Sequence, residues 1–119
     1  MSTQKNVAES TFRETVLDQG FHLIEFQNDS SEPQKFERDI DNTYIQLHFC
    51  IKGKSKFIFN NSSYALDVLD RRSIILYNPQ RKLPINLLIF PQTSLMSLLI
   101  PIEKFHSLFS KEASYIPFL

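Results

Sequence analysis

Between Tyr44 and Ile100 the sequence is built from short segments in which apolar and polar residues alternate, separated by tight polar turns. The clearest is the run YIQLHFCI at residues 44–51. Its alternating apolar positions are Ile45, Leu47, Phe49 and Ile51, and the positions between them are Gln46, His48 and Cys50. A period of two gives a strand two different faces. The pattern fixes two faces but does not say which one points inward.

Six such segments follow one another closely enough to form an antiparallel barrel. We expect strands at 44–51, 56–60, 64–68, 73–77, 83–90 and 94–100, preceded by a first strand at 21–28. The chain has only two glycines, so its turns must use Asn, Asp, Ser and Lys. Eleven Phe in an all-β pattern indicate a barrel or sandwich interior.

Composition narrows the class of protein. The 119 residues are enough for one domain, and thirteen basic residues balance thirteen acidic ones. That balance argues against a domain that itself binds nucleic acid. The single cysteine, Cys50, forms no internal disulfide and is interpreted as a small buried apolar side chain. The polar start lacks a signal peptide, and no apolar stretch is long enough for a membrane span, so we expect a cytoplasmic protein.

Both ends differ from the middle. Residues 1–20 are expected to be a leader with a short helix at Thr11–Gln19, which ends at Gly20. The charged segment 28–42 is interpreted as a mobile loop or an edge segment. After the barrel at 21–100, residues 101–119 are expected to form a helix and a tail. The helix carries one apolar stripe: Ile102, Phe105, Leu108 and Phe109. The apolar tail suggests a truncated linker.

Residues 47–84, LHFCIKGKSKFIFNNSSYALDVLDRRSIILYNPQRKLP, resemble a cupin barrel, and more narrowly the N-terminal sensor domain of AraC-type transcription regulators. The segment IEKFHSLF at 102–109 is similar to the dimerisation helix of that family. The resemblance implies an all-β fold: a cupin-like antiparallel β-barrel, or double-stranded β-helix, followed by a C-terminal amphipathic helix. It also implies a homodimer that pairs through the helical stripe.

The metal ligands of the cupin pattern are not found at the matching positions. Gln46 stands where the carboxylate would be, seven residues before Gly53, and residues 39–42 hold no histidine. In the second motif only Pro79 is kept, and the other positions fall on Ser73, Arg81 and Pro84. We therefore expect no metal and no cofactor, and a protein that is not an enzyme.

The residues expected to line a ligand pocket, from strand parity, are Gln46, His48, Phe57, Phe59 and Tyr77. His48 has two interpretations. It is a hydrogen-bonding group for a small ligand, or it is a half-buried histidine that a neighbouring strand satisfies. The basic residues Arg71, Arg72, Arg81 and Lys82 flank one strand, and they mark an anion site, a contact with a partner domain or a solvated turn.

The resemblance implies that the chain binds a small-molecule effector and dimerises, and that DNA is contacted only by a helix-turn-helix domain that this chain does not contain. Two alternatives stay open. One is a small metal-free cupin enzyme of the sugar isomerase or epimerase type, which needs an acid–base pair in the barrel. The other is a pairing module whose barrel is filled by its own side chains and holds no ligand.

Overall fold

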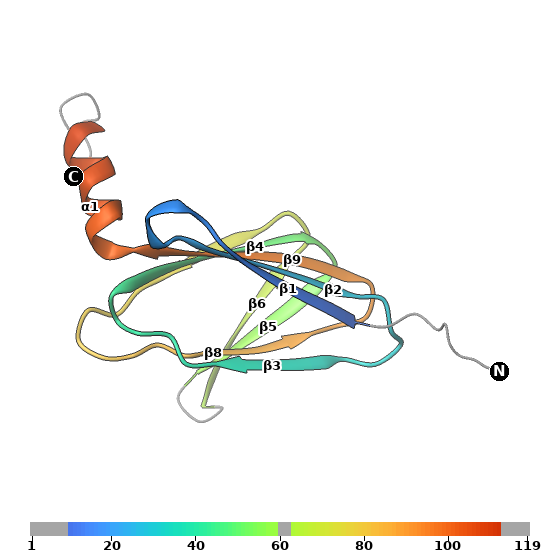
Figure 1. Ribbon diagram of the computed structural model, residues 1–119. Helices are drawn as coiled ribbons and strands as arrows, with labels where there is room; N and C mark the ends of the chain where they lie inside the picture. Colours follow the sequence, from blue (N-terminus) through green and yellow to red (C-terminus); the bar gives the residue numbers. More distant parts are fainter. Residues whose placement is uncertain (1–9, 60–62, 113–119) are drawn as a thin grey trace.

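Two antiparallel sheets face each other in the computed structural model, which describes residues 10–59 and 63–112 (Figure 1). The five-stranded sheet has the order β1 (Ser10–Val16), β2 (His22–Asn28), β9 (Thr93–Pro101), β4 (Tyr44–Lys52) and β7 (Ser73–Leu76). The four-stranded sheet has the order β3 (Gln34–Arg38), β8 (Ile85–Ile89), β5 (Lys54–Phe59) and β6 (Tyr64–Leu69). Apart from the consecutive pairs β1–β2 and β5–β6, neighbouring strands in each sheet are distant in sequence, as in a double-stranded β-helix.

The core lies between the sheets and is filled from alternate positions of each strand. The buried apolar side chains include Ile24, Phe26, Phe57, Val68, Ile85, Leu87, Leu95 and Leu99. On β4 it is Gln46, His48 and Cys50 that point inward, and all three are at most 1% exposed. Leu47, Phe49 and Ile51 therefore lie on the outer face of the five-stranded sheet.

The turn between β4 and β5 requires its glycine. Gly53 has a φ of +97°, and a Cβ atom there would lie 2.3 Å from Thr93 Oγ1 and 2.8 Å from the Gln92 carbonyl oxygen. Only glycine adopts this conformation without strain and also leaves room for Thr93. The Gly53 N–H donates to Asp70 Oδ1 at 2.6 Å, which ties this turn to the end of β6.

The predicted helix at Thr11–Gln19 is wrong. The segment forms β1, which pairs with β2 over seven residues from Ser10 opposite Asn28 to Val16 opposite His22, followed by a short 3₁₀ turn at Asp18–Gly20. Thr11, Thr15 and Val16 favour a strand because they are β-branched, and tertiary pairing overrides the weak helical signal. The segment 28–42 contains β3, an edge strand that pairs with β8.

The predicted C-terminal helix is confirmed as α1 (Ile102–Glu112), which continues directly from β9 and projects from one end of the sheets (Figure 1). The Ile102 N–H donates to the Thr43 carbonyl oxygen at 2.7 Å and so fixes the start of the helix. Ile102 and Phe105 are half-buried, whereas the side chains of Leu108 and Phe109 lie outside the described part. The helical interface stays a prediction. No helix within the described ranges could cross a membrane.

Candidate functional site

A chain of hydrogen bonds crosses the core at the position where the sequence placed a ligand. The Gln46 amide Nε2 donates to the Leu83 carbonyl oxygen at 2.5 Å, and Gln46 Oε1 lies 2.8 Å from His48 Nε2. His48 Nδ1 lies 2.5 Å from Ser97 Oγ. Since Gln46 Oε1 can only accept, His48 must donate from Nε2 and accept at Nδ1 from the Ser97 hydroxyl. With His48 in this one neutral tautomer, the hydrogen bonds among Gln46, His48 and Ser97 are all satisfied.

His48 is sealed from solvent. Its side chain is fully buried, and its ring centroid lies 4.5 Å from that of Phe57. Burial lowers the pKa of His48 from 6.5 to about 3, because the charged form would lose its hydration. Its partners are an amide and a hydroxyl rather than a carboxylate. The nearby Cys50 thiol is also buried, and burial raises its pKa.

Two adjoining hollows open instead at one end of the barrel, which we call the mouth. The first has a volume of about 550 Å³ and is lined by Ile58, Phe59, Asn78, Arg81, Lys82, Leu83, Pro84 and Asn86. The second has a volume of about 400 Å³ and is lined by Phe59, Tyr64, Leu66, Ile75, Leu76, Tyr77, Asn78 and Leu83. The hollows share Phe59, Asn78 and Leu83. Each volume is within the range of small-molecule sites.

The two hollows differ in chemistry. The second is aromatic and aliphatic, whereas the first carries Arg81 and Lys82, both exposed. Neither cation makes a hydrogen bond or ion pair with the described residues. The Asn86 side-chain oxygen is buried and has no hydrogen-bond partner among the described residues. The mouth therefore offers unpaired polar groups beside an apolar surface.

Residues 77–84, between β7 and β8, form one wall of the mouth and are held at two points. The first is the bond from Gln46 to the Leu83 carbonyl, and the second is the bond from Asn42 Nδ2 to the Pro79 carbonyl oxygen at 3.1 Å. Asn42 adjoins Thr43, whose carbonyl accepts the first N–H of α1. The wall of the mouth and the base of the helix are thus connected through residues 42–43 at the same end of the barrel (Figure 1).

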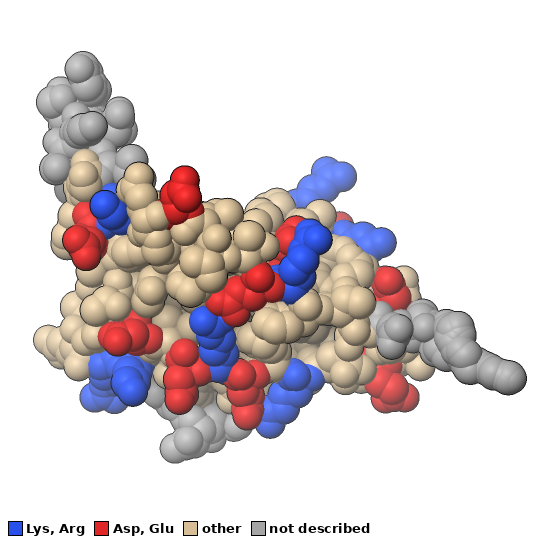
Figure 2. All heavy atoms as spheres, in the orientation of Figure 1, with Lys and Arg blue, Asp and Glu red and all other residues tan. Residues whose placement is uncertain are grey.

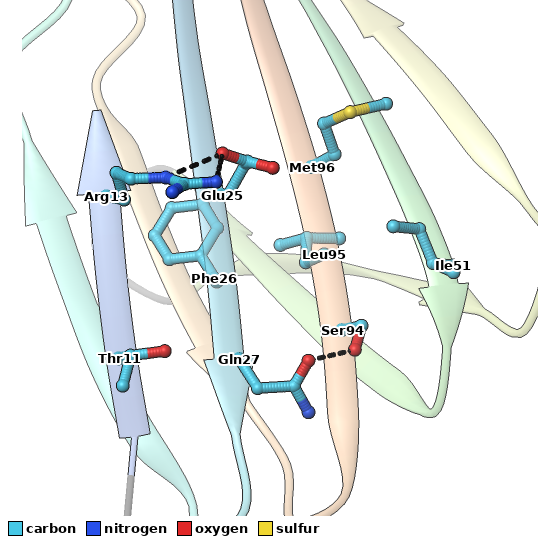
Figure 3. Close-up of a pocket in the computed structure, with 9 residues that line it drawn as sticks. All are labelled: Thr11, Arg13, Glu25, Phe26, Gln27, Ile51, Ser94, Leu95 and Met96. Carbon is cyan, nitrogen blue, oxygen red and sulfur yellow. Dashed lines mark hydrogen bonds and ion pairs between the residues drawn. The ribbon is translucent and has the colours of Figure 1, made fainter. Parts of the chain in front are cut away.

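A further hollow, of about 400 Å³, lies on the outer face of the five-stranded sheet (Figure 3). Its charged groups are already paired, since Arg13 binds Glu25 at 2.8 Å, and Gln27 accepts a hydrogen bond from the Ser94 hydroxyl. With its polar groups satisfied, this surface is a weaker candidate for a small polar ligand. Within the described ranges no three His, Cys, Asp or Glu side chains come together as metal ligands.

The structure separates the predicted pocket residues into two groups. Gln46, His48 and Phe57 meet in the core and border none of these hollows, whereas Phe59 and Tyr77 line the mouth. Arg81 and Lys82 lie in the mouth as well. The sequence analysis interpreted them as part of an anion site, a contact with a partner domain or a solvated turn. Sequence reasoning missed the lining residues Tyr64, Leu66, Asn78, Leu83 and Asn86. The available signal was the basic turn NPQRKLP with its two prolines.

No protein-family model matches the chain, and no curated protein does so. Several solved structures, however, are similar to the chain. A cupin superfamily protein from Desulfitobacterium hafniense has a TM-score of 0.56 at 10% identity, over 86% of this chain and 84% of that one. The cupin domain of an XRE family transcriptional regulator from Enterobacter cloacae has a TM-score of 0.54 at 6% identity, over 76% and 95%. The chain spans about half, 51%, of an HTH_3 family transcriptional regulator from Vibrio cholerae.

Enzymes are equally similar. Ectoine synthase from P. lautus has a TM-score of 0.53 at 13% identity, over 87% of this chain and 75% of that one. A polyketide cyclase and a putative mannose-6-phosphate isomerase are also among the similar structures. The expectation that the chain is not an enzyme is therefore corrected, because the same fold serves enzymes and regulators at comparable similarity. The predicted fold class is confirmed: the chain has the cupin fold.

Proposed function

We propose that the chain is the ligand-sensing domain of a transcription regulator, of the AraC type, and that its effector binds in the mouth. The cupin domain of a regulator is among the similar structures. The observation that carries the proposal is the position of the mouth, whose wall at 77–84 is bonded to Asn42, next to the residue that anchors α1. A ligand there contacts a segment that is bonded to Asn42, the residue before the Thr43 carbonyl that accepts the first N–H of α1.

The lining of the mouth favours an anion with an apolar, preferably aromatic, body. Arg81 and Lys82 make no ion pair with the described residues, so their side chains can donate charge-assisted hydrogen bonds to a carboxylate or a phosphate. Phe59, Tyr64 and Tyr77 supply the surface for a ring or a short chain. Binding such a compound buries apolar area in the second hollow and neutralises the cations of the first.

Sensing requires that the ligand favour one of two arrangements of the molecule. The proposed arrangements differ in the position of residues 77–84 relative to Asn42 and Thr43, and therefore in how firmly the first turn of α1 is held. The core chain of Gln46, His48 and Ser97 serves as the fixed support, since it is sealed and fully hydrogen-bonded. DNA is contacted by a separate domain.

The test compares two compounds that differ only in charge: 4-phenylbutyrate and 4-phenylbutan-1-ol. Calorimetric titration of the protein should show tighter binding of the carboxylate. The double variant Arg81→Gln, Lys82→Gln should weaken carboxylate binding about tenfold or more, as loss of charge-assisted hydrogen bonds predicts. The matched control is Arg71→Gln, Arg72→Gln, which removes the same charge from the exposed turn after β6.

Equal affinity for the two compounds, or equal weakening by both double variants, contradicts the proposed anion site. The sensing step has its own measurement. Saturating carboxylate should change the hydrogen-exchange rate of the Ile102 amide, which bonds to Thr43. If the carboxylate binds without changing the exchange rate of the Ile102 amide, the mouth is a ligand site, but the proposed sensing function is contradicted.

A further inference from the structure

An edge strand of one sheet faces an edge strand of the other on each side of the barrel, and the two sides are closed differently. On the side of β1 and β3, the ring of Phe36 lies 5.0 Å from that of Phe12 and 4.8 Å from that of Phe26. Arg38 of β3 also binds Glu14 of β1. The hollow on this side has a volume of only about 110 Å³. The chain therefore closes this side with its own side chains.

The side of β6 and β7 is open. The turn at 70–72 joins the two strands at the end away from the mouth. Toward the mouth, no side-chain hydrogen bond, ion pair or ring contact links β6 to β7 within the described ranges. The second hollow, of about 400 Å³, lies between them. Tyr64, Ile75 and Tyr77 border it and are 55%, 64% and 38% exposed. Apolar side chains thus line an opening that the described residues leave uncovered.

The edge of β6 beside this opening has free main-chain groups. In an edge strand, alternate residues direct their N–H and C=O groups away from the sheet. Near the far end of β6 the main chain has further partners, since the Leu69 carbonyl accepts from the Arg72 N–H and the Val68 carbonyl from the Ser55 hydroxyl, both at 2.9 Å. Within the described ranges, residues 64–67 make no main-chain hydrogen bond beyond their ladder with β5. The free part of the edge is therefore the part that borders the hollow.

Three kinds of binding group meet at this opening. The second hollow supplies an aromatic and aliphatic surface, and the edge of β6 supplies main-chain donors and acceptors. The adjoining first hollow supplies Arg81 and Lys82, which make no ion pair with the described residues. A simple aromatic acid uses the surface and the cations but leaves the strand edge unpaired. An extended peptide that carries a carboxylate uses all three.

We propose that the effector is an extended peptide with an aromatic side chain and a carboxylate, and that it adds a strand to the free edge of β6. This inference rests on the proposed function and narrows its ligand from an aromatic anion to a peptide. The ring enters the second hollow, and the carboxylate accepts hydrogen bonds from Arg81 and Lys82. Strand addition of this kind takes its affinity from main-chain hydrogen bonds and its specificity from side-chain pockets.

The geometry fixes the length and direction of the peptide. Residues 64–67 span about 13 Å at about 3.3 Å per residue, so four peptide residues cover the free edge. Because β6 begins at the mouth, a peptide whose C-terminal carboxylate lies at the cations runs antiparallel to β6.

The test uses the wild-type chain and varies the ligand. Calorimetric titration compares 4-phenylbutyrate with a tetrapeptide that is acetylated at its amino end and ends in phenylalanine with a free carboxylate. The peptide should bind at least about tenfold more tightly, because it adds main-chain hydrogen bonds to a similar ring and charge. Two matched control peptides are N-methylated at the odd or at the even positions. One should lose at least about tenfold in affinity and the other should keep the parent affinity, since only alternate N–H groups face β6.

Hydrogen exchange locates the peptide. Amides of residues 64–67 should exchange more slowly in the complex, whereas those of β3, the other edge strand of the same sheet, should be unchanged. Slowed exchange at β3 in place of β6 overturns the inference. So does a peptide that binds no more tightly than 4-phenylbutyrate, or equal affinity of the two N-methylated peptides, although the aromatic anion of the proposed function then still stands. If neither the peptide nor 4-phenylbutyrate binds, the inference and the proposed function both fail.

Discussion

The sealed core and the open mouth are both polar regions of one barrel, yet their polar groups are in opposite states. In the core, Gln46, His48 and Ser97 satisfy one another and the Leu83 carbonyl, and no water reaches them. In the mouth, Arg81 and Lys82 have no partner among the described residues. A polar side chain whose hydrogen bonds are all made within the protein supports the structure, whereas one without a partner can bind a ligand. Charged side chains of both signs are interspersed on the side of β3 and β8 (Figure 2), where Lys35 pairs with Glu37.

Removing His48 should have the largest effect on stability. His48→Ala leaves a cavity against Phe57 and orphans Gln46 and Ser97, so the free energy of unfolding should fall by about 3–5 kcal/mol. Tyr77→Ala in the mouth is the control, and it should cost less than about 1 kcal/mol because Tyr77 is 38% exposed. Urea denaturation measures both. Similar losses for the two variants would show that core and mouth are not distinct.

Gln46 connects the two regions and should have the next largest effect. Gln46→Leu removes the partner of His48 Nε2 and of the Leu83 carbonyl, at a cost of about 2–3 kcal/mol. The same change should loosen residues 77–84, measured as faster hydrogen exchange and weaker carboxylate binding. A variant with native exchange rates in that segment would contradict the supporting role of the core.

The pH dependence of stability should report on the sealed histidine. Burial lowers the pKa of folded His48 to about 3, while the unfolded residue titrates near its ordinary 6.5. As pH falls below 6.5, His48 therefore takes up a proton in the unfolded chain but not in the folded chain. The free energy of unfolding declines as a result. The slope from this residue approaches about 1.4 kcal/mol per pH unit, and the contribution is complete above pH 6.5.

The non-titrating variant His48→Gln isolates this effect. Between pH 6.5 and 5, its stability should depend less on pH than that of the wild type, although it is lower throughout. Parallel pH profiles for the two proteins would show that His48 is protonated in the folded state and that the core is open to solvent.

The smallest effect on stability should come from the cations of the mouth. Arg81→Gln together with Lys82→Gln should change the free energy of unfolding by less than about 0.5 kcal/mol, because both side chains are exposed and make no ion pair with the described residues. Thermal unfolding without ligand measures this. A loss of more than about 1 kcal/mol in the free energy of unfolding would show that Arg81 and Lys82 have a structural role. It would contradict the distinction between the mouth and the core.

Alternation along the chain was enough to predict the all-β barrel and the C-terminal helix, because periods of two and 3.6 reflect which side chains are buried. It failed at Thr11–Gln19, where β1 is stabilised by pairing with β2, a contact distant in sequence. It also could not tell that the Gln46 face of β4 points inward, since the outer face, with Leu47, Phe49 and Ile51, is the more apolar of the two. Alternation defines two faces of a strand without saying which one is buried.

The candidate site was harder to predict than the fold. Gln46 and His48 are polar residues on a strand and so attracted a functional interpretation, but their bonding partners, Ser97 and the Leu83 carbonyl, come from distant strands and turns. The mouth is assembled from residues of β5, β6, β7 and β8 and from residues 77–84. Such a site has no periodicity, because turns lack a repeating side-chain direction. Only the basic, proline-bounded turn marked it.

The central claim is that a ligand binds in the mouth and leaves the core untouched. Nuclear magnetic resonance titration with 4-phenylbutyrate tests it, with backbone amides and the His48 ring nitrogens followed together. The predicted result is shifts at 77–84, Phe59 and Tyr64, while His48 keeps its neutral, Nε2-protonated tautomer with unchanged ring shifts. Large changes at the His48 ring with a silent 77–84 segment would place the ligand in the core and contradict the account.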